Sequence, residues 1–148
     1  MRSTKLFVLV LLSAIAPASY AGCPITNVRQ FAEAVADAHK HNALEAIDRK
    51  YAGKNRFKVI IENSLAENDA FERTTATRFA EVARWLKRRQ VEGFPAPDIR
   101  KLVECKNGVC VFDLNEGIDH NTLYLEEIHY EGRPTCAKLQ SIKFLDGD

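Results

Sequence analysis

The stretch KLVECKNGVCVFDL, residues 101–114, carries the strongest fold signal in this 148-residue sequence. Its centre, Asn107-Gly108, separates two short segments that are rich in β-forming residues. An Asn-Gly pair between such segments is typical of a two-residue turn, because both residues tolerate the positive φ angles that this turn requires. The sequence therefore predicts a β-hairpin made of strands 101–105 and 110–114.

The geometry of this hairpin predicts a disulfide. In a type I′ turn, Lys106 and Val109 form the hydrogen-bonded pair that closes the loop. Cys105 and Cys110 are then a non-hydrogen-bonded pair, with α-carbons about 4.5 Å apart and side chains on one face. That separation lies at the short end of the range that a disulfide spans. We therefore predict a Cys105–Cys110 bridge. Next along the same face we expect Val103 and Phe112.

The other two cysteines, Cys23 and Cys136, are expected to pair with each other by elimination. Their bridge closes a long loop, and the chain-entropy model gives it roughly 5 kcal/mol, against about 2 kcal/mol for the hairpin bridge. A zinc site is disfavoured because the spacings lack the paired Cys-x-x-Cys form. The four cysteines therefore predict two bridges and no metal.

The first 21 residues have the three parts of a secretory signal peptide. Arg2 and Lys5 form a basic start, residues 6–16 form an apolar run, and Ser19-Tyr20-Ala21 supplies a cleavage site. The apolar run is too short for a stable membrane anchor, which needs about 20 residues. The sequence therefore predicts an exported protein, periplasmic or secreted, with disulfides and with no stable membrane anchor after cleavage.

An alternative interpretation places a lipid on Cys23, since Ala21-Gly22-Cys23 suits the end of a lipoprotein cleavage motif. Tyr20 stands where that motif usually has a Leu-like residue. A lipid on Cys23 would also leave three cysteines, an odd number. Cleavage after Ala21 keeps all four available for pairing, so it is the preferred interpretation.

Residues 22–148 have a length that suits a single disulfide-stapled domain with one core. This segment has 19 basic and 20 acidic side chains. Its balanced charge gives no electrostatic reason to expect nucleic acid as a partner. It contains no Gly-rich phosphate loop and no serine-nucleophile motif. No cofactor is expected.

Apolar spacing predicts a pair of helices at the start of this domain. Asn27 and Gln30 form a capping pair for a helix that continues to about Ala38. Asn42 is expected to cap a second helix, which ends at Gly53.

A strand and a long helix are predicted to follow. Residues 57–61 contain a β-branched run typical of a strand. Asn68 or Asp69 is expected to open a helix that continues to about Gln90. The apolar face of this helix is expected to include Phe71, Thr75, Phe79, Val82, Ala83 and Leu86.

The second half of the domain is predicted to be mostly strands. Residues 93–97, Gly-Phe-Pro-Ala-Pro, are expected to be a connector. Residues 122–130 and 137–145 are expected to form a hairpin that turns at residues 133–135. Strict alternation places Leu123, Leu125, Glu127 and His129 on one face, and Tyr124, Glu126, Ile128 and Tyr130 on the other.

This order of helix pair, strand, long helix and curling sheet resembles the nuclear transport factor 2-like superfamily. Segments FAEAV (residues 31–35) and ALEAI (43–47) resemble its opening helix pair, and KLQSIKFLDG (138–147) resembles its terminal strand. The resemblance implies an α+β fold with N-terminal helices on a curved antiparallel sheet, a cystatin-like or nuclear transport factor 2-like roll around a cavity. Members include isomerases, dehydratases, cyclases and binding domains, so the fold assigns no reaction.

Asp119, His120 and His129 are the candidate catalytic residues. An imidazole titrates near neutrality, and a carboxylate can orient it for proton transfer. However, neighbouring residues in a strand face opposite sides. A loop in which Asp119 bonds the local backbone explains the same pair without chemistry. The sequence therefore favours a structural explanation of these residues over a catalytic role.

Two further clusters have structural explanations. His39 and His41, with Asp37 and Asp48, lack a fixed third ligand, so no metal is expected. Aromatic and aliphatic side chains of the strand 122–130 would suit a patch that contacts a partner, although core packing explains such residues more often. The patch would consist of Tyr124, Ile128 and Tyr130.

The sequence thus predicts an exported binding domain more than an enzyme. Its partner is expected to be a protein, such as a toxin or cell-envelope enzyme that it inhibits or scaffolds, or a small apolar molecule held in the cavity. The alternative is an enzyme that uses the cavity, with His120 or His129 and a carboxylate as acid and base.

Overall fold

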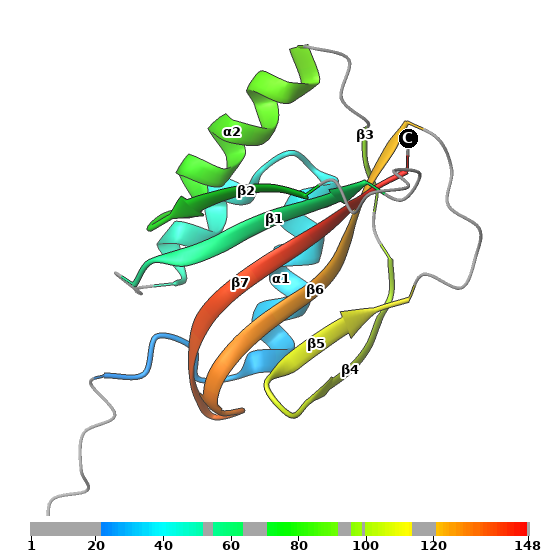
Figure 1. Cartoon of the computed structure of the whole chain (residues 1–148). Helices are drawn as coiled ribbons and strands as arrows, with labels where there is room; N and C mark the ends of the chain where they lie inside the picture. Colours follow the sequence, from blue (N-terminus) through cyan, green and yellow to red (C-terminus); the bar gives the residue numbers. More distant parts are fainter. Residues whose placement is uncertain are drawn as a thin grey trace, which may run out of the picture.

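Three helical elements lie against one face of a seven-stranded open sheet, so the fold is mixed α+β (Figure 1). The computed structural model describes residues 22–51, 55–63, 71–91, 96–98, 100–113 and 121–147. The predicted signal peptide lies outside them. The helices are α1 (Val28–Lys40), the 3₁₀ helix η1 (Leu44–Arg49) and α2 (Phe79–Val91). The strands are β1 (Phe57–Asn63), β2 (Phe71–Ala76), β3 (Ala96–Asp98), β4 (Leu102–Lys106), β5 (Val109–Phe112), β6 (Thr122–Arg133) and β7 (Cys136–Asp146).

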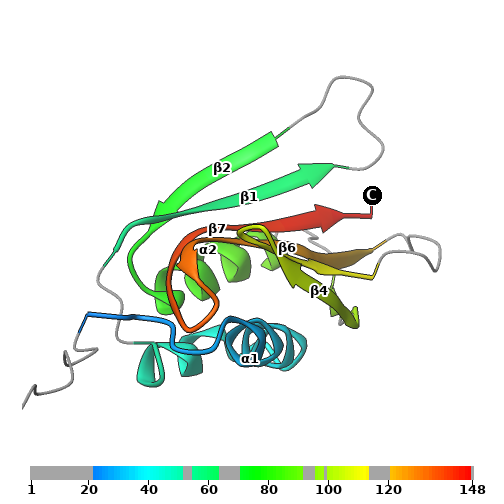
Figure 2. The ribbon, with the colours of Figure 1, turned by 90° about the horizontal axis from the view of Figure 1, so that it is seen from below.

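The sheet has the strand order β2-β1-β7-β6-β5-β4, and β3 pairs with one end of β6. Figure 2 shows α1 and η1 as a layer beneath this sheet. The expectation of a purely antiparallel sheet is wrong, because β1 runs parallel to β7 and β3 runs parallel to β6. Parallel neighbours need a long connection, and the segment between β1 and β7, which includes α2, provides one.

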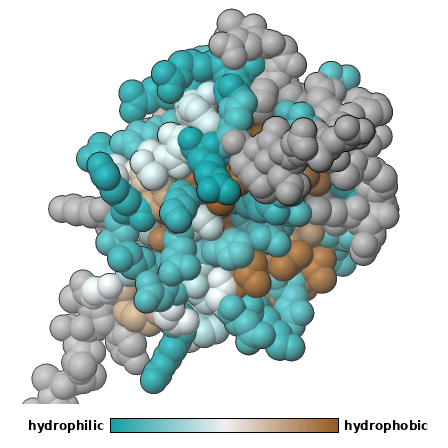
Figure 3. Space-filling view, viewed as in Figure 1, coloured by the Kyte–Doolittle hydropathy of each residue, from teal (hydrophilic) through white to brown (hydrophobic). Residues whose placement is uncertain are grey.

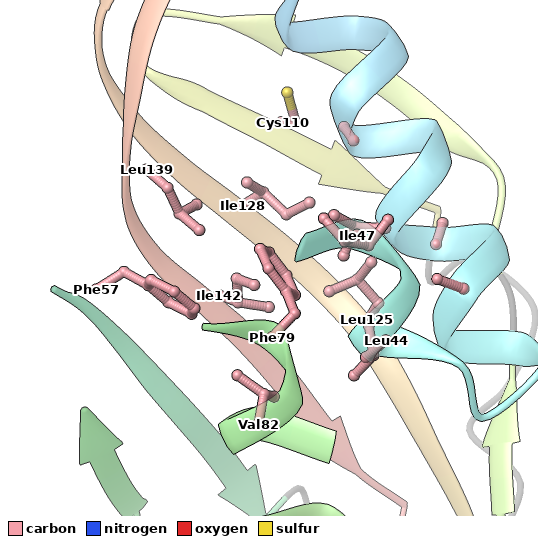
Figure 4. Packing of buried hydrophobic residues seen from close by; sticks show 14 of the residues in the cluster. Leu44, Ile47, Phe57, Phe79, Val82, Cys110, Leu125, Ile128, Leu139 and Ile142 are labelled. Atoms are coloured by element: carbon pink, nitrogen blue, oxygen red, sulfur yellow. The ribbon is translucent and has the colours of Figure 1, made fainter. Parts of the chain in front are cut away.

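The hydrophobic core fills the space between the helices and the inner face of the sheet. In Figure 4, Phe79 of α2 and Ile47 of η1 gather with Leu125, Ile128 and Ile142 of the sheet. All five side chains are at most 4% exposed. Each large apolar side chain contributes about 1.5–3 kcal/mol when it is fully buried. This cluster is therefore the main favourable contribution to folding.

The first helix begins as predicted. The Asn27 side chain accepts a hydrogen bond from the Gln30 backbone N–H at 3.0 Å, which satisfies one of the free donors of the first turn. The helix continues through Lys40, slightly beyond the expected end.

The predicted role of Asn42 as a helix cap is wrong. Asn42 has a φ of 51°, and its N–H bonds the His39 carbonyl at 3.1 Å. The next N–H, of Ala43, bonds the Ala38 carbonyl at 2.8 Å. These two bonds form a Schellman motif, so Asn42 ends α1. The second helix is consequently a short 3₁₀ helix without a side-chain cap, and its predicted end, Gly53, lies outside the described residues.

The first half of the predicted long helix is a strand. Residues 71–76 pair one for one with β1, and α2 starts only at Phe79. Asn68 and Asp69 lie outside the described residues. The carboxylate of Asp48, 31 residues earlier, accepts hydrogen bonds from the N–H groups of Phe79 and Ala80 at 2.7 and 2.9 Å. The cap that starts α2 thus comes from η1, where no local pattern could indicate it.

The predicted β4–β5 hairpin is confirmed. Asn107 and Gly108 have φ angles of 51° and 83°, as a turn of this type requires. Cys105 lies opposite Cys110, and a disulfide joins them with α-carbons 4.0 Å apart.

The expectation that Val103 and Phe112 share the face that carries the bridge is wrong. A bulge between Leu102 and Glu104 places Leu102 opposite Phe112. The extra residue shifts the alternation of side chains. Val103 is therefore 56% exposed, whereas Phe112 is buried.

The β6–β7 hairpin is also confirmed, but its expected face assignment holds only at the start. Leu125 pairs with Phe144, whereas Glu127 pairs with Lys143, so Glu126 is an extra residue in β6. This bulge reverses the alternation. The inner face carries Leu123, Leu125, Ile128 and Tyr130, and Glu127 and His129 lie on the outer face.

The expected connector at residues 93–97 is only partly correct. Ala96 and Pro97 belong to β3, which pairs with Thr122 and Leu123 of β6. Residues 92–95 lie outside the described part of the chain. A proline is tolerated because β3 is a short strand at the margin of the sheet.

The start of the described chain is fastened to β7. A disulfide joins Cys23 to Cys136, with α-carbons 4.9 Å apart. Beside it, the backbones of Ile25 and Ala137 exchange two hydrogen bonds, at 3.0 and 2.8 Å. These ties position the first turn of α1 over the end of the sheet.

Candidate functional site

The candidate site is a pocket of about 450 Å³ between the helices and the start of β6. Its apolar walls come from η1, α2 and β6, and its polar rim comes from the end of α1, η1 and α2. The apolar lining residues are Leu44, Ala80, Ala83, Leu86 and Leu123; the polar ones are His39, Asn42, Glu45, Arg84 and Lys87. A mostly apolar concavity with a few convergent polar groups is the usual form of a small-molecule site.

His39 lies at the base of this pocket. It sits on the last turn of α1, is 2% exposed, and its Nε2 lies 2.9 Å from the Leu123 carbonyl oxygen. Its ring packs against Phe144 at a centroid distance of 4.9 Å. Because a carbonyl oxygen only accepts, Nε2 carries the proton and Nδ1 is left as the acceptor of the neutral ring.

The protonation of His39 follows from its burial. Burial lowers the pKa of His39, and the opposing effects of the Leu123 carbonyl and the Asp98 carboxylate are smaller. The neutral imidazole is therefore the expected form at neutral pH. It links α1 to the sheet and gives the pocket a polar base without a charge.

The rim of the pocket carries more positive than negative charge. Arg84 and Lys87 of α2 are exposed, as is Glu45 of η1. Asp48 positions the two cations, since its bonds to the first turn of α2 fix where that helix begins. The arrangement can hold an apolar group against the walls and an anionic group at the rim.

The predicted catalytic candidates do not meet in this pocket. Asp119 and His120 lie outside the described residues. His129 lies on the outer face of the sheet, where its Nε2 is 2.7 Å from a carboxylate oxygen of Glu127. The His129 side chain is 41% exposed, so this pair is a surface ion pair when the ring is protonated.

Glu126 is part of a separate ion-pair cluster on the outer face. Its carboxylate lies 3.0 Å from Lys143 Nζ, which also pairs with Glu62 of β1. Burial lowers the pKa of Lys143, but hydrogen bonds to Glu62 and Glu126 raise it above its ordinary value. The ammonium group therefore stays charged and links the three neighbouring strands β1, β7 and β6.

Core packing, the favoured explanation for Tyr124, Ile128 and Tyr130, is confirmed, and these residues form no exposed contact patch. These side chains are 1%, 0% and 5% exposed. The bulge in β6 turns Ile128 and Tyr130 into the core, and the Arg100 guanidinium lies 4.3 Å from the Tyr124 ring centroid. Figure 3 shows that the outer face is largely hydrophilic, with an apolar area over β4 and β5.

The groups considered for a metal site are used elsewhere. His39 bonds Leu123, Asp48 caps α2, and His41 Nδ1 bonds the Asp37 carbonyl at 2.8 Å. Within the described ranges, no three His, Cys, Asp or Glu residues are grouped so that they could hold a metal ion.

Sequence reasoning weighed His39 only as a metal ligand and missed its place in the pocket. The signal was present, because His39 follows Ala32, Val35 and Ala36 at helical spacing on the buried face of α1. The contribution of α2 was predicted in part, since Ala83 and Leu86 lie on the expected apolar face of that helix and line the pocket.

Comparison with protein-family models, with curated proteins and with solved structures found no match. In the described part of the chain, no helix is long and apolar enough to cross a membrane.

Proposed function

We propose that this chain is an exported binding domain that holds a small apolar molecule carrying an anionic group. The observation that carries the proposal is the 450 Å³ pocket with apolar walls and two cations, Arg84 and Lys87, at its rim. The apolar walls supply affinity by removing ligand surface from water. The cations orient the anionic end.

The same pocket favours binding over catalysis. Its one histidine donates Nε2–H to a backbone carbonyl, and burial lowers its pKa, so the ring stays neutral and links α1 to the sheet. The side chain is also buried at the base of the pocket. We therefore propose His39 as a positioning group that fixes the pocket wall.

Export is part of the proposal. Two disulfides fit an oxidising compartment such as the periplasm. The bridge from Cys23 to Cys136 supports cleavage by an ordinary signal peptidase over lipidation, because a bridged sulfur cannot also carry a lipid.

We also propose that the fold is a roll of the nuclear transport factor 2-like kind. Support comes from the order of α1, η1, the β1–β2 hairpin, α2 and the strands β4–β7, and from the placement of the helices on one face. The pocket then lies at the mouth of the roll, between the helices and the sheet.

Binding of dodecanoate, followed by isothermal titration calorimetry, tests the proposed function. Dodecanoate should bind at one site, and uncharged dodecanol should bind more weakly because it lacks the anionic end. An Ala83→Trp variant should lose binding, since the indole fills the pocket. The surface variant Arg49→Trp, on η1 but outside the pocket lining, should bind like the wild type.

A second variant tests the role of the rim. Lys87→Ala should weaken dodecanoate by about threefold, as expected for one exposed charge pair, and should leave dodecanol unchanged. Equal affinity of all proteins for both ligands, or no saturable binding by the folded wild type, would overturn the proposal.

A further inference from the structure

The two edges of the sheet are built differently. At one edge, β4 contains a bulge at Val103 and is clipped to β5 by a disulfide. At the other edge, β2 pairs with β1 through six successive residues without a register shift. Bulges protect an edge from adding a further strand, whereas a regular edge presents free backbone groups at even spacing. Among the described residues, β2 pairs with β1 alone.

A groove of about 630 Å³ runs beside this regular edge. Thr74 and Thr75 of β2 form one wall, and α2 forms the other with Trp85 and its charged neighbours. In Figure 1, α2 diverges from β2 toward the C-terminal end of the helix. The groove therefore lies between a strand edge and a helix, an arrangement that can accept an extended peptide.

The helix wall of the groove is strongly cationic. Arg84, Lys87 and Arg88 are exposed, and no ion pair among the described residues includes them. One neighbouring acid, Glu72, is paired with Arg89. The positive charge along this wall is consequently left for an outside partner.

The other acid of the groove, Glu81, already accepts hydrogen bonds from Thr77. Its carboxylate accepts hydrogen bonds from the Thr77 N–H and hydroxyl at 2.8 and 3.1 Å. The bond from the Thr77 N–H holds the pKa of Glu81 below its usual range. These bonds hold the carboxylate at the start of α2, where it also interacts electrostatically with Arg84. Lys87 and Arg88, further along the helix, keep the groove cationic.

We propose that the groove between β2 and α2 binds an extended acidic segment of another protein, which adds to β2 as an eighth strand. The backbone of the segment bonds the free edge of β2. Its acidic side chains face Arg84, Lys87 and Arg88, and an apolar side chain packs on Trp85. This site shares Arg84 and Lys87 with the pocket that holds the small molecule, whereas Thr74, Thr75, Trp85 and Arg88 line the groove alone.

Fluorescence anisotropy with a labelled ten-residue peptide of alternating Glu and Val tests the site. The protein should bind this peptide and not the matched peptide of alternating Lys and Val. A Glu–Val peptide that is N-methylated on alternate residues keeps the charge but loses backbone donors, so it should bind at least about tenfold more weakly. Hydrogen exchange of residues 71–76 should slow when the unmethylated peptide is bound.

Matched protein variants separate the groove from general charge attraction. Arg88→Glu, which changes the groove but not the small-molecule pocket, should weaken the Glu–Val peptide by about fivefold. Lys50→Glu makes the same charge change on the surface and should have little effect. Dodecanoate binding should be unchanged in both variants, so the two sites succeed or fail separately.

Three results would overturn the inference. The first is equal binding of the methylated and unmethylated peptides, which would mean that no strand is added. The second is an equal loss of affinity in the two charge variants, which would mean non-specific attraction. The third is binding of a heparin fragment without any binding of the Glu–Val peptide, which would indicate a polysaccharide ligand.

Discussion

Helices α1 and α2 both contain 13 residues, but their first turns are capped from different places. Asn27, directly before α1, accepts a hydrogen bond from the backbone of Gln30. The cap of α2 is Asp48, which reaches the helix from η1, 31 residues earlier in the sequence. Free backbone donors in a first turn must be satisfied in both cases. A local cap can be read from a sequence, whereas a distant one depends on the finished fold.

The difference also concerns how each helix is coupled to the rest of the molecule. With its cap alone, α1 could begin in an isolated chain, and its position on the sheet comes from the Cys23–Cys136 bridge and His39. By contrast, α2 acquires its cap only when η1 is in place. We therefore expect the position of α1 to depend on the Cys23–Cys136 bridge and on the His39 hydrogen bond. The first turn of α2 should depend on the hydrogen bonds from Asp48.

The largest effect is expected from removing the bridge that positions α1. The double variant Cys23→Ser/Cys136→Ser should lower the free energy of unfolding by about 5 kcal/mol, because the bridge closes a loop with a sequence separation of 113. Cys105→Ser/Cys110→Ser should lower it by only about 2 kcal/mol, for a separation of 5. Urea unfolding followed by circular dichroism measures both.

Non-reducing peptide mapping checks the premise of this experiment. It should recover Cys23 linked to Cys136 and Cys105 linked to Cys110 in the wild type. A link between Cys23 and Cys105 would contradict the pairing, and equal destabilisation by the two double variants would contradict the loop-length argument.

The next effect concerns the cap of α2. Asp48→Ala should cost about 2 kcal/mol, because two N–H groups of a partly buried helix start lose a charged acceptor. Asp48→Asn should cost less, since one side-chain oxygen remains. Glu45→Ala, on the same 3₁₀ helix but exposed, serves as the control in urea unfolding. The comparison fails if the two alanine variants are equally stable.

The local cap of α1 should matter less. Asn27→Ala is expected to lower the free energy of unfolding by about 1 kcal/mol, which is typical for the loss of one N-cap bond. Asn27→Asp keeps an acceptor and should restore most of that loss. If Asn27→Ala destabilises the protein more than Asp48→Ala does, the local and distant caps are not ranked as proposed.

Features that depend on neighbouring residues could be predicted from the sequence, and features that depend on distant residues could not. The Asn107-Gly108 turn, the Asn27 cap and the strands β6 and β7 depend on neighbouring residues, and the structure contains them. The segment at residues 71–76 was misassigned because its conformation depends on pairing with β1, since tertiary pairing overrides weak local preference.

The candidate site was harder to predict than the fold. Its walls combine η1, α2 and the first residues of β6, and the prediction made η1 too long and started α2 too early. A single extra residue, Glu126, also reversed the faces of β6, and alternation alone contains no signal for such a bulge. Apolar periodicity could nevertheless have placed His39 on the buried face of α1.

The smallest change in the free energy of unfolding at neutral pH is expected from His39, which links α1 to the sheet through the Leu123 carbonyl. Its pKa is lowered mainly by burial, so below about pH 6.5 the unfolded chain binds a proton more readily than the folded one. Stability should therefore fall as the pH decreases from 7.5 to 5.5. His39→Phe should reduce this dependence in urea unfolding, and the exposed control His41→Phe should retain it. A wild-type stability that rises on acidification would contradict the assigned direction.

The parallel pairing of β1 with β7 has a consequence for a chain that is synthesised from its N-terminus. Residues 58–63 find their parallel partners in residues 141–146, so the centre of the sheet can close only after β7 has been synthesised. Until then β1 has only its hairpin with β2, and two strands alone are marginally stable. Non-local pairing of this kind slows folding. During synthesis the β1–β2 hairpin therefore waits for β7 before it can join the rest of the sheet.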